Sequence, residues 1–410
     1  MSSEEIRKKF LEFFRARGHA IVPSSSLIPD DPSVLLTTAG MQQFKRYFTG
    51  ELDPLRDFRD KDGNPTRNTA SIQKSFRTSD IDEVGDESHL TFFEMLGNFS
   101  FGGYFKEEAI KYGYEFITEE MGLEIDYVSV FEGDSEVPAD TDSEKIWKSL
   151  GVKNIKKFGR KDNFWGPTGA EGPCGPTTEI YVRGGEIWNI VFNEYYQHKD
   201  KKLKKLEVSG VDTGMGLERL AMVSRNVPTI FETDLFQEAF KIVAQEKSKR
   251  VFTDHLRASI FLIGDGVRPS NKGAGSALRR LMRRVVFHAR KMTGEDEGGG
   301  TFLTAQEIRE ALSGGIQFYG NASPDYKNLL SSEATVLEVF EDERGRFLQS
   351  LNSGMPEFNR VVRAGGHLES DQNVKIKMFG ELSAENAFYL SQSHGLSREV
   401  LKDLCDERGI

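Results

Sequence analysis

The stretch QKSFRTSDIDEVGDESHLTFFEMLGNFSFGGYF, residues 73–105, predicts two antiparallel strands joined by a polar turn. Arg77 closes the first strand, an acidic turn follows, and the segment from His89 to Phe93 begins the return. Such a hairpin can bring a guanidinium, an imidazole and an aromatic face around one planar, polyanionic ligand. Arginine suits this use because it makes charge-assisted, bidentate contacts to phosphate oxygens.

The aromatic residues of this stretch also have a plainer interpretation. Phe92, Phe93 and Phe99 are what a hydrophobic core needs, and the sequence does not decide between core packing and ligand contact. Arg77 is harder to explain by packing alone, because a charged side chain beside a hydrophobic strand needs a partner. We therefore keep Arg77 as a candidate ligand-binding residue.

Outward from this hairpin, segments rich in β-branched and aromatic residues predict further strands. They are YVSVF (127–131), EIYV (179–182) and EIWNIVFNEYY (186–196), and VLLTT (34–38) is a candidate for a short buried strand. Between them, GPTGAEGPCGPTT (166–178) predicts a long Gly/Pro-rich turn system, and such loops are commonly functional.

Helical periodicity marks both ends of the chain. At the N-terminus we expect an amphipathic helix that Ser3 caps and Gly18 ends, with an apolar face made of Ile6, Phe10, Phe13 and Phe14. After about residue 234, helix-period patterns dominate, as in Leu337, Phe340, Phe347, Leu348 and Leu351. The sequence therefore predicts an α+β protein with a β-rich first half and a helical second half.

Composition excludes several classes of protein. The chain has 410 residues, 29% of them charged, no apolar run of bilayer length, and a charged N-terminus that is unlike a signal peptide. We therefore expect no membrane association and a cytoplasmic location. Cys174 and Cys405 are too few for a disulfide framework or a four-cysteine zinc site. No P-loop, HExxH or GxSxG motif is present, the seven histidines are scattered, and no metal ligands are assigned.

The charge is unevenly distributed. The net charge is −10, but the block from Lys249 to Lys291 holds eleven Lys and Arg and only two Asp, and so carries +9. Its segment RRLMRRVVFHARK (279–291) places four cations along one stripe of a helix: Arg279, Arg280, Arg283 and Arg284. A solvated charged face is the usual explanation of such a run, but a run without any acid is unbalanced. The block therefore predicts a localised interaction surface.

VDTGMGLERL (211–220) is a second candidate ligand segment. Asp212 ends a strand, the glycines permit close backbone approach, and a helix carrying Arg219 follows. Asp212 can hold an ammonium group and Arg219 can neutralise a phosphate. An Asp that caps the helix beside a surface Arg is the alternative, and it stays open. A third segment, DNFWGPTGAEGPCGPTTEI (162–180), is a loop anchored by Trp165.

Together these segments resemble the alanyl-tRNA synthetases, a family of class II aminoacyl-tRNA synthetases. FFEMLGNFSFGGYF, NFWG with GPCGP and EI, EIWNIVF and VDTGMGLERL stand in that family's order and spacing. LLTTAGMQQFK and DHLRASIFLIGDGVRPSNKGAGSALRRLMRR are also similar to it, so the resemblance covers the chain. Residues near 21–48, 73–101 and 212–220 resemble the three class II motifs.

The resemblance implies a class II catalytic domain at 1–240, an antiparallel β-sheet flanked by helices. It implies a mainly α-helical domain at 241–410 that recognises the tRNA acceptor stem. Arg77, Asp212 and Arg219 would be catalytic. Arg77 would contact the ATP α-phosphate and the alanine carboxylate, His89 would lie near the phosphates, Phe93 and Arg219 would sandwich the adenine, and Asp212 would hold the alanine ammonium. The positions that match the alanine pocket are Trp165, Asn189, Val191 and Gly214.

The same resemblance implies how tRNA is read. Asn271, in PSNKGAG, resembles the Asn with which the family reads a G·U pair, since an amide oxygen accepts from the guanine amino group. A turn Asn before Gly273 is the alternative. The four arginines of 279–284 would lie beside RNA phosphates.

The implied activity is that of an alanine–tRNA ligase, which uses ATP and Mg²⁺ to form alanyl-adenylate and transfers alanine to the 3′ end of tRNA(Ala). The chain stops at Ile410, so we expect it to lack the family's editing and C-terminal domains and to be a monomer. The alternative is a non-catalytic tRNA- or ATP-binding paralogue. Joint retention of Arg77, Asp212 and Arg219 favours the enzyme, because a pure binder has no reason to keep an ammonium-binding Asp.

Overall fold

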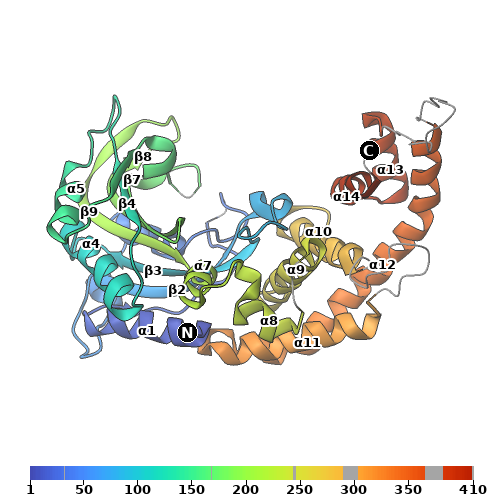
Figure 1. Cartoon of the computed structure of the whole chain (residues 1–410), viewed down its shortest axis with the longest axis horizontal. Helices are drawn as coiled ribbons and strands as arrows, with labels where there is room; N and C mark the ends of the chain where they lie inside the picture. The colour runs from blue at the N-terminus through green and yellow to red at the C-terminus, as the bar shows by residue number, and fades with distance from the viewer. Residues whose placement is uncertain (32, 168, 243–245, 290–302, 365–381, 409–410) are drawn as a thin grey trace. The chain divides into compact units, whose positions relative to one another are not determined.

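The computed structural model describes residues 1–31, 33–167, 169–242, 246–289, 303–364 and 382–408 (Figure 1). The chain divides into two compact units that interchange two short segments. The first unit comprises residues 1–78, 87–243 and 321–327, and the second comprises residues 79–86, 244–320 and 328–410. The domain boundary expected between residues 240 and 241 stays a prediction.

A nine-stranded mixed sheet forms the centre of the first unit (Figure 1). The strands follow the order β1-β2-β3-β9-β8-β7-β4-β5, and β6 pairs with β7. The pairs β1–β2 and β4–β5 are parallel and the others are antiparallel. The predicted α+β class, with a largely antiparallel sheet flanked by helices and a helical region after it, is confirmed. The strands are β1 (Ala20–Ile21), β2 (Asn68–Phe76), β3 (Phe92–Ser100), β4 (Tyr127–Phe131), β5 (Ile155–Phe158), β6 (Phe164–Trp165), β7 (Gly172–Val182), β8 (Gly185–Gln197) and β9 (Leu203–Gly216).

Short helices lie before, between and after these strands. They are α1 (Ser3–Ala16), η1 (Gly40–Phe44), α2 (Lys45–Phe48), α3 (Pro54–Asp57), η2 (Thr78–Asp82), α4 (Lys106–Glu115), the π-helical turn η3 (Phe116–Glu120), α5 (Thr141–Ser149), α6 (Arg160–Asn163), α7 (Leu217–Arg225), η4 (Ile230–Glu232), α8 (Asp234–Phe240) and η5 (Pro324–Tyr326). The predicted apolar face of α1 is confirmed, since Ile6, Phe10, Phe13 and Phe14 are buried. The expected cap at Ser3 is wrong. Ser2 caps α1 in a reciprocal capping box with Glu5, because Ser3 is already the first helical residue and its side chain is buried.

Helix α1 covers one face of the sheet. Its Phe10 ring lies 6.1 Å, centroid to centroid, from the ring of Trp188 on β8. Arg7, on the same face of the helix, donates two hydrogen bonds of 2.7 and 2.6 Å to the carboxylate of Glu94 on β3. Glu94 is fully buried and also accepts from the Tyr326 hydroxyl at 3.0 Å. This face is therefore a closed core of aromatic side chains around one buried ion pair.

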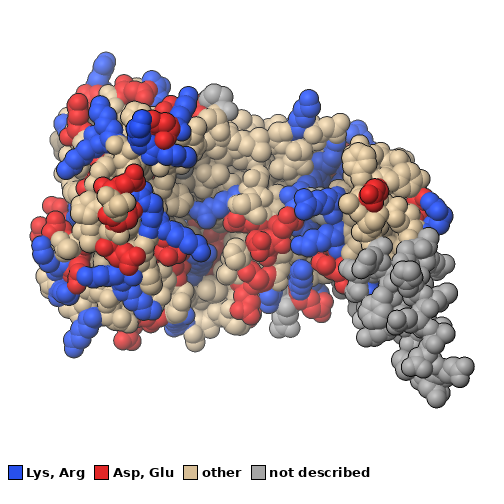
Figure 2. All heavy atoms as spheres, turned by 90° about the horizontal axis from the view of Figure 1, so that it is seen from above, with Lys and Arg blue, Asp and Glu red and all other residues tan. Residues whose placement is uncertain are grey.

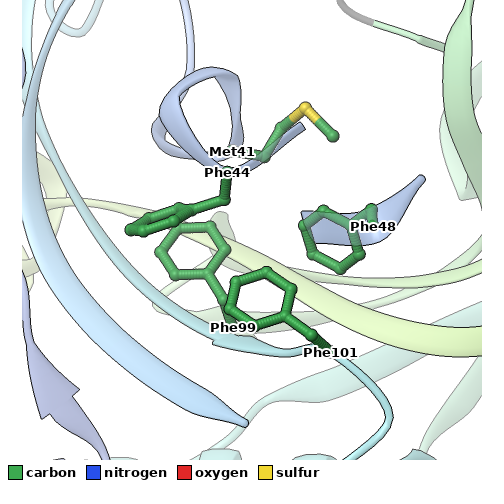
Figure 3. Close-up of a cluster of buried hydrophobic side chains, with 5 residues drawn as sticks. All are labelled: Met41, Phe44, Phe48, Phe99 and Phe101. Atoms are coloured by element: carbon green, nitrogen blue, oxygen red, sulfur yellow. The ribbon is translucent and has the colours of Figure 1, made fainter. Parts of the chain in front are cut away.

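The opposite face of the sheet is only partly covered. Met41, Phe44 and Phe48, from η1 and α2, pack onto Phe99 and Phe101 at the end of β3 (Figure 3). The rings of Phe44 and Phe99 lie 4.5 Å apart, so Phe99 belongs to this core. The cluster closes one end of the face and leaves the remainder of it to the residues described below.

Three of the strand predictions from sequence are confirmed and two loop or strand assignments are wrong. YVSVF is β4, EIYV lies in β7, and EIWNIVFNEYY lies in β8. Residues 34–38 form no strand, and only part of the run is buried, since Leu36 is 1% but Leu35 49% exposed. Residues 172–178 belong to β7 instead of a turn system. Pairing survives the two prolines there because a register shift separates Cys174 from Thr177 and Gly175 packs against the β8 backbone.

The second unit contains the long helices α9 (Lys247–Gly264), α10 (Gly273–Ala289), α11 (Ala305–Ala322), α12 (Asn328–Ala364), α13 (Ala384–His394) and α14 (Arg398–Arg408). The predicted helical pattern of 337–351 is confirmed in α12, where Phe340, Phe347 and Leu351 are buried. Helices α9 and α10 pack together along apolar faces that include Leu256 and Leu281. In the described part of the chain, no helix has the length and apolarity that crossing a membrane requires.

Candidate functional site

Strand register brings candidate residues of two strands, β8 and β9, onto one face of the sheet. Asp212 on β9 lies between Phe99 on β3 and Val191 on β8, and Asn189 on β8 lies opposite Gly214 on β9. Directly opposed residues of antiparallel strands project to the same side. The side chains of Asp212, Val191 and Asn189 therefore share the partly covered face.

Asp212 is the most unusual group on this face. Its side chain is 6% exposed, and among the described residues no cation or hydrogen-bond donor pairs with its carboxylate, so that burial alone shifts its pKa. Burial raises the pKa of Asp212 to about 7. A buried carboxylate without a partner is costly, and a ligand that brings an ammonium group would remove that cost. Because Asp212 lies inside β9 and α7 begins at Leu217, Asp212 is not the cap of that helix.

Small and sulfur-containing residues shape the space beside Asp212. Val191 is 4% exposed. A Cβ on Gly214 would lie 3.0 Å from the Sδ atom of Met95, and the Gly40 N–H donates to the same sulfur at 3.2 Å. Met95 therefore already fills the volume that a side chain at residue 214 would need. Met95 therefore limits the space on this face next to Gly214.

Arg77 and Phe93 lie together at the open end of the β2–β3 hairpin. Arg77 directly follows β2, and its N–H donates to the Thr91 carbonyl at 2.9 Å. Its guanidinium carbon lies 4.9 Å from the centroid of the Phe93 ring. Both side chains are half-buried, and His89 lies in the connection just before β3. A cation and an exposed aromatic face are therefore adjacent, as the hairpin pattern predicts.

Arg219, in the first turn of α7, is held by a residue that the sequence did not single out. Its Nη1 atom donates to the Glu186 carboxylate at 2.8 Å and to the Glu186 carbonyl at 3.2 Å. The two side chains are 40% and 32% exposed, so the pair lies at the surface of the site. Glu186 thus orients Arg219 without burying its charge.

Glu179 on β7 is a second residue that the sequence reasoning missed. It accepts from Asn189 Nδ2 at 3.1 Å and from the Tyr181 hydroxyl at 2.7 Å. Burial raises the pKa of Glu179 to about 7, the charge of Glu186 adds to the rise, and the Tyr181 hydrogen bond opposes it. The Oδ1 atom of Asn189 is buried and accepts no hydrogen bond from the described residues. The sequence did carry a signal for Glu179 and Glu186, because a charged residue in a strand as apolar as EIYV or EIWNIVF is unusual.

Trp165 lies on β6, which pairs with β7 so that Trp165 opposes Gly175. A Cβ on Gly175 would lie 1.8 Å from the Phe192 carbonyl oxygen, so only glycine fits there. Trp165 thus lies on a strand rather than in the loop that the sequence predicts, and its anchoring role stays a prediction.

The arginines of the basic helix α10 pair with acids from elsewhere in the second unit. Arg283 Nε donates to Glu343 at 2.8 Å, and Arg279 Nε lies 3.3 Å from the same carboxylate. Arg280 pairs with Asp82 at 2.6 Å. The charge of the run is therefore partly balanced in three dimensions, because other segments bring acids to the helix, and the predicted interaction surface stays a prediction. Figure 2 likewise shows basic and acidic side chains side by side over much of the visible face.

The residues expected to contact RNA differ in exposure. Asn271 is exposed before α10, where its side-chain oxygen accepts from Arg279. Arg279, Arg280 and Arg283 are half-buried, whereas Arg284 is 3% exposed. Arg284 donates to the Ile81 carbonyl at 2.6 Å, so its guanidinium serves an internal contact. Arg290 and Lys291, at the end of the same run, lie outside the described residues.

A comparison with protein families identifies the fold. The profile of the family described as tRNA synthetases class II (A) matches residues 5–410. The chain belongs to this family. The sheet, the helical unit that follows it and the order of the sequence motifs all agree with membership of this family.

Several proteins that are similar to this chain are called alanine–tRNA ligase. The Rubrobacter xylanophilus protein is 40% identical over 454 residues, covering 100% of this chain and 48% of the relative. The Thermotoga maritima protein is 39% identical, covering 100% of this chain and 47% of the relative. The Borrelia hermsii protein is 36% identical, covering 100% of this chain and 70% of the relative. The chain thus spans about half the length of the first two relatives.

Proposed function

We propose that this chain activates alanine with ATP and transfers it to the 3′ end of tRNA(Ala), as an alanine–tRNA ligase does. The observation that carries the proposal is the buried, unpaired Asp212 carboxylate, which shares a face of the sheet with a small apolar contact, Val191. An ammonium group satisfies the carboxylate, and the limited space beside it suits a methyl side chain. Trp165, Asn189 and Gly214 are the other proposed pocket positions.

In the first step, an alanine carboxylate oxygen attacks the ATP α-phosphorus and pyrophosphate leaves. Arg77 offsets the negative charge at the α-phosphate and the carboxylate, and Asp212 fixes the amino acid by its ammonium. Phe93 stacks against the adenine, and Arg219, oriented by Glu186, closes over the other side of the ring. His89 lies near the phosphates. Positioning and charge stabilisation supply the catalysis, so no protein nucleophile is required.

Magnesium enters this scheme with the nucleotide. In the described residues, no group of three or more His, Cys, Asp or Glu side chains is arranged to hold a metal ion. Mg²⁺ is commonly held by one or two carboxylates together with substrate phosphates, and in that form it neutralises phosphate charge. Glu179 and Glu186 are the carboxylates on or beside the face that could complete such a shell.

In the second step, the terminal ribose hydroxyl of tRNA attacks the carbonyl of alanyl-adenylate. Asn271 is exposed and its amide can accept a hydrogen bond from a guanine amino group in the acceptor stem. Arg279 and Arg283 are proposed to contact backbone phosphates, whereas Arg280 and Arg284 of the same stripe contact Asp82 and Ile81. A monomeric state stays a prediction that sedimentation at several concentrations tests.

Alanine-dependent ATP–pyrophosphate exchange tests the first step. We expect exchange by the wild type and a loss of at least about 100-fold in Asp212→Asn, because the ammonium then has no buried counter-charge. Asp200→Asn is the matched control, since Asp200 is 54% exposed and pairs only with Lys202 at the surface. ATP binding without alanine-dependent exchange would instead support the non-catalytic paralogue.

A further inference from the structure

The connection between β2 and β3 belongs to the helical unit although it joins two strands of the sheet. Residues 79–86 cluster with the second unit, while Thr78 and Glu87 on either side cluster with the first. The segment is fixed there by apolar contacts, since Ile81 is 1% exposed and Val84 is fully buried. It is therefore a docked element of the helical unit and not a free turn.

Two arginines of α10 hold this segment by polar contacts. Arg280 Nη2 lies 2.6 Å from Asp82 Oδ1, and Arg284 Nη1 donates to the Ile81 carbonyl at 2.6 Å. The Arg284 side chain is 4% exposed and lies 3.7 Å from Asp82. The pKa of Asp82 is lowered overall. Burial raises it, but the hydrogen bond from Arg280 and the charges of Arg280 and Arg284 together lower it by more. Asp82 is therefore held as a carboxylate by the helix.

Helix α9 approaches the other end of the same segment. Arg250 Nη1 donates to the Gly85 carbonyl at 3.4 Å. Gly85 has a φ of +128°, and a Cβ there would lie 2.7 Å from Lys247 Cγ. Both the backbone conformation and the close approach favour glycine at this position. The segment is thus held at Ile81, Asp82 and Gly85 by side chains of two helices.

The segment lies, along the chain, between two proposed ATP-binding residues. Arg77 precedes Ser79 by two residues, and His89 follows Asp86 by three. A side chain that is only two or three residues from an anchor loses much of its conformational freedom when that anchor is fixed. In a reaction catalysed by positioning, small displacements of such groups have large effects on the rate.

We propose that Arg280, through Asp82, is a positioning residue for amino-acid activation, which fixes the segment between Arg77 and His89 independently of tRNA. Arg284 supports the same segment from a buried position. The proposal rests on the proposed activity. It differs from the RNA-contact role that the sequence predicts for Arg280, because it assigns that guanidinium to a carboxylate of this chain.

The test is tRNA-free ATP–pyrophosphate exchange on Arg280→Ala, Asp82→Ala and the double variant. We expect each single variant to raise the KM for ATP about tenfold. The double variant should be no worse than either single one, because both remove the same contact. Arg280→Lys should recover part of the loss. A defect confined to folding would lower kcat at an unchanged KM, which would overturn the proposal.

Arg360→Ala is the matched control, since it removes a guanidinium that pairs with Glu357 on α12 of the same unit. Hydrogen–deuterium exchange gives a readout besides activity. We expect amides of residues 79–86 to exchange faster in Arg280→Ala and Asp82→Ala, with β3 unchanged. Unaltered tRNA-free kinetics in Arg280→Ala, with only tRNA charging reduced, would overturn the proposal in favour of RNA contact. Absence of exchange in the wild type would overturn the proposed function and the positioning role with it, while the deuterium measurement would still report whether Arg280 holds the segment.

Discussion

Replacing Arg7 by Met should destabilise the first unit strongly. Arg7 is 5% exposed and makes hydrogen bonds of 2.7 and 2.6 Å to Glu94, which is fully buried. In the variant, Glu94 keeps the Tyr326 hydroxyl at 3.0 Å but loses both hydrogen bonds from Arg7. Removing one partner of a buried ion pair costs about 3–5 kcal/mol. We expect the free energy of unfolding to fall by that amount.

Urea unfolding followed by tryptophan fluorescence measures this fall. The protein has 3 tryptophans, and Trp147, Trp165 and Trp188 all lie in the first unit, so the signal reports the unit that contains the ion pair. The double variant with Glu94→Gln should recover much of the loss, because the carboxylate that Arg7 serves is then replaced by a neutral amide. Arg46→Met is the control, since Arg46 and Glu51 are 64% and 58% exposed and such pairs contribute less than about 1 kcal/mol. A loss below about 1 kcal/mol in Arg7→Met would refute the reasoning.

Three further predictions concern the sheet. Gly175→Ala should lower the free energy of unfolding by about 1–3 kcal/mol or more, because its Cβ would lie 1.8 Å from the Phe192 carbonyl oxygen. Gly166→Ala is the control and should change it little, because no atom lies within 4 Å of a Cβ there. Equal urea midpoints for the two variants would contradict this prediction. As the pH rises from 4 to 7, the free energy of unfolding of the wild type should fall relative to that of Asp212→Asn. Burial raises the pKa of Asp212 to about 7, so only the unfolded chain releases that proton in this range. Parallel stability curves for the two proteins would contradict this prediction. The kcat/KM for alanine should rise with pH to a plateau above about 7, because binding of the alanine ammonium needs the ionised Asp212 carboxylate. A flat pH profile would exclude Asp212 as the group that titrates.

The sequence predicts these strands because they are rich in β-branched and aromatic residues. YVSVF and EIWNIVFNEYY match the bounds of β4 and β8 almost to the residue. The apolar residues of α1 recur at helical spacing, and they are the residues that the helix buries. Residues 172–178 were misassigned because Gly and Pro indicate turns locally. Their pairing depends on a register shift and on a close backbone contact with a distant strand, which no local pattern encodes.

The candidate site was predictable only where a segment carries its own chemistry. Arg77 beside Phe93 follows from one hairpin, and the structure brings the two within 4.9 Å. Glu186 on Arg219 and Glu179 on Asn189 depend on strand neighbours, so they were missed. The pairing of α10 arginines with Asp82 and Glu343 was missed for the same reason, since those acids lie far away along the chain.

The most direct measurement of the central claim is the binding of a non-hydrolysable sulfamoyl analogue of alanyl-adenylate and of its propionyl counterpart, which lacks the amino group. If Asp212 holds the alanine ammonium, calorimetry should show that the wild type prefers the amino compound by roughly 100-fold. Asp212→Asn should bind the two compounds nearly equally. A preference that survives unchanged in Asp212→Asn would contradict the account, because the ammonium would then be held by another group.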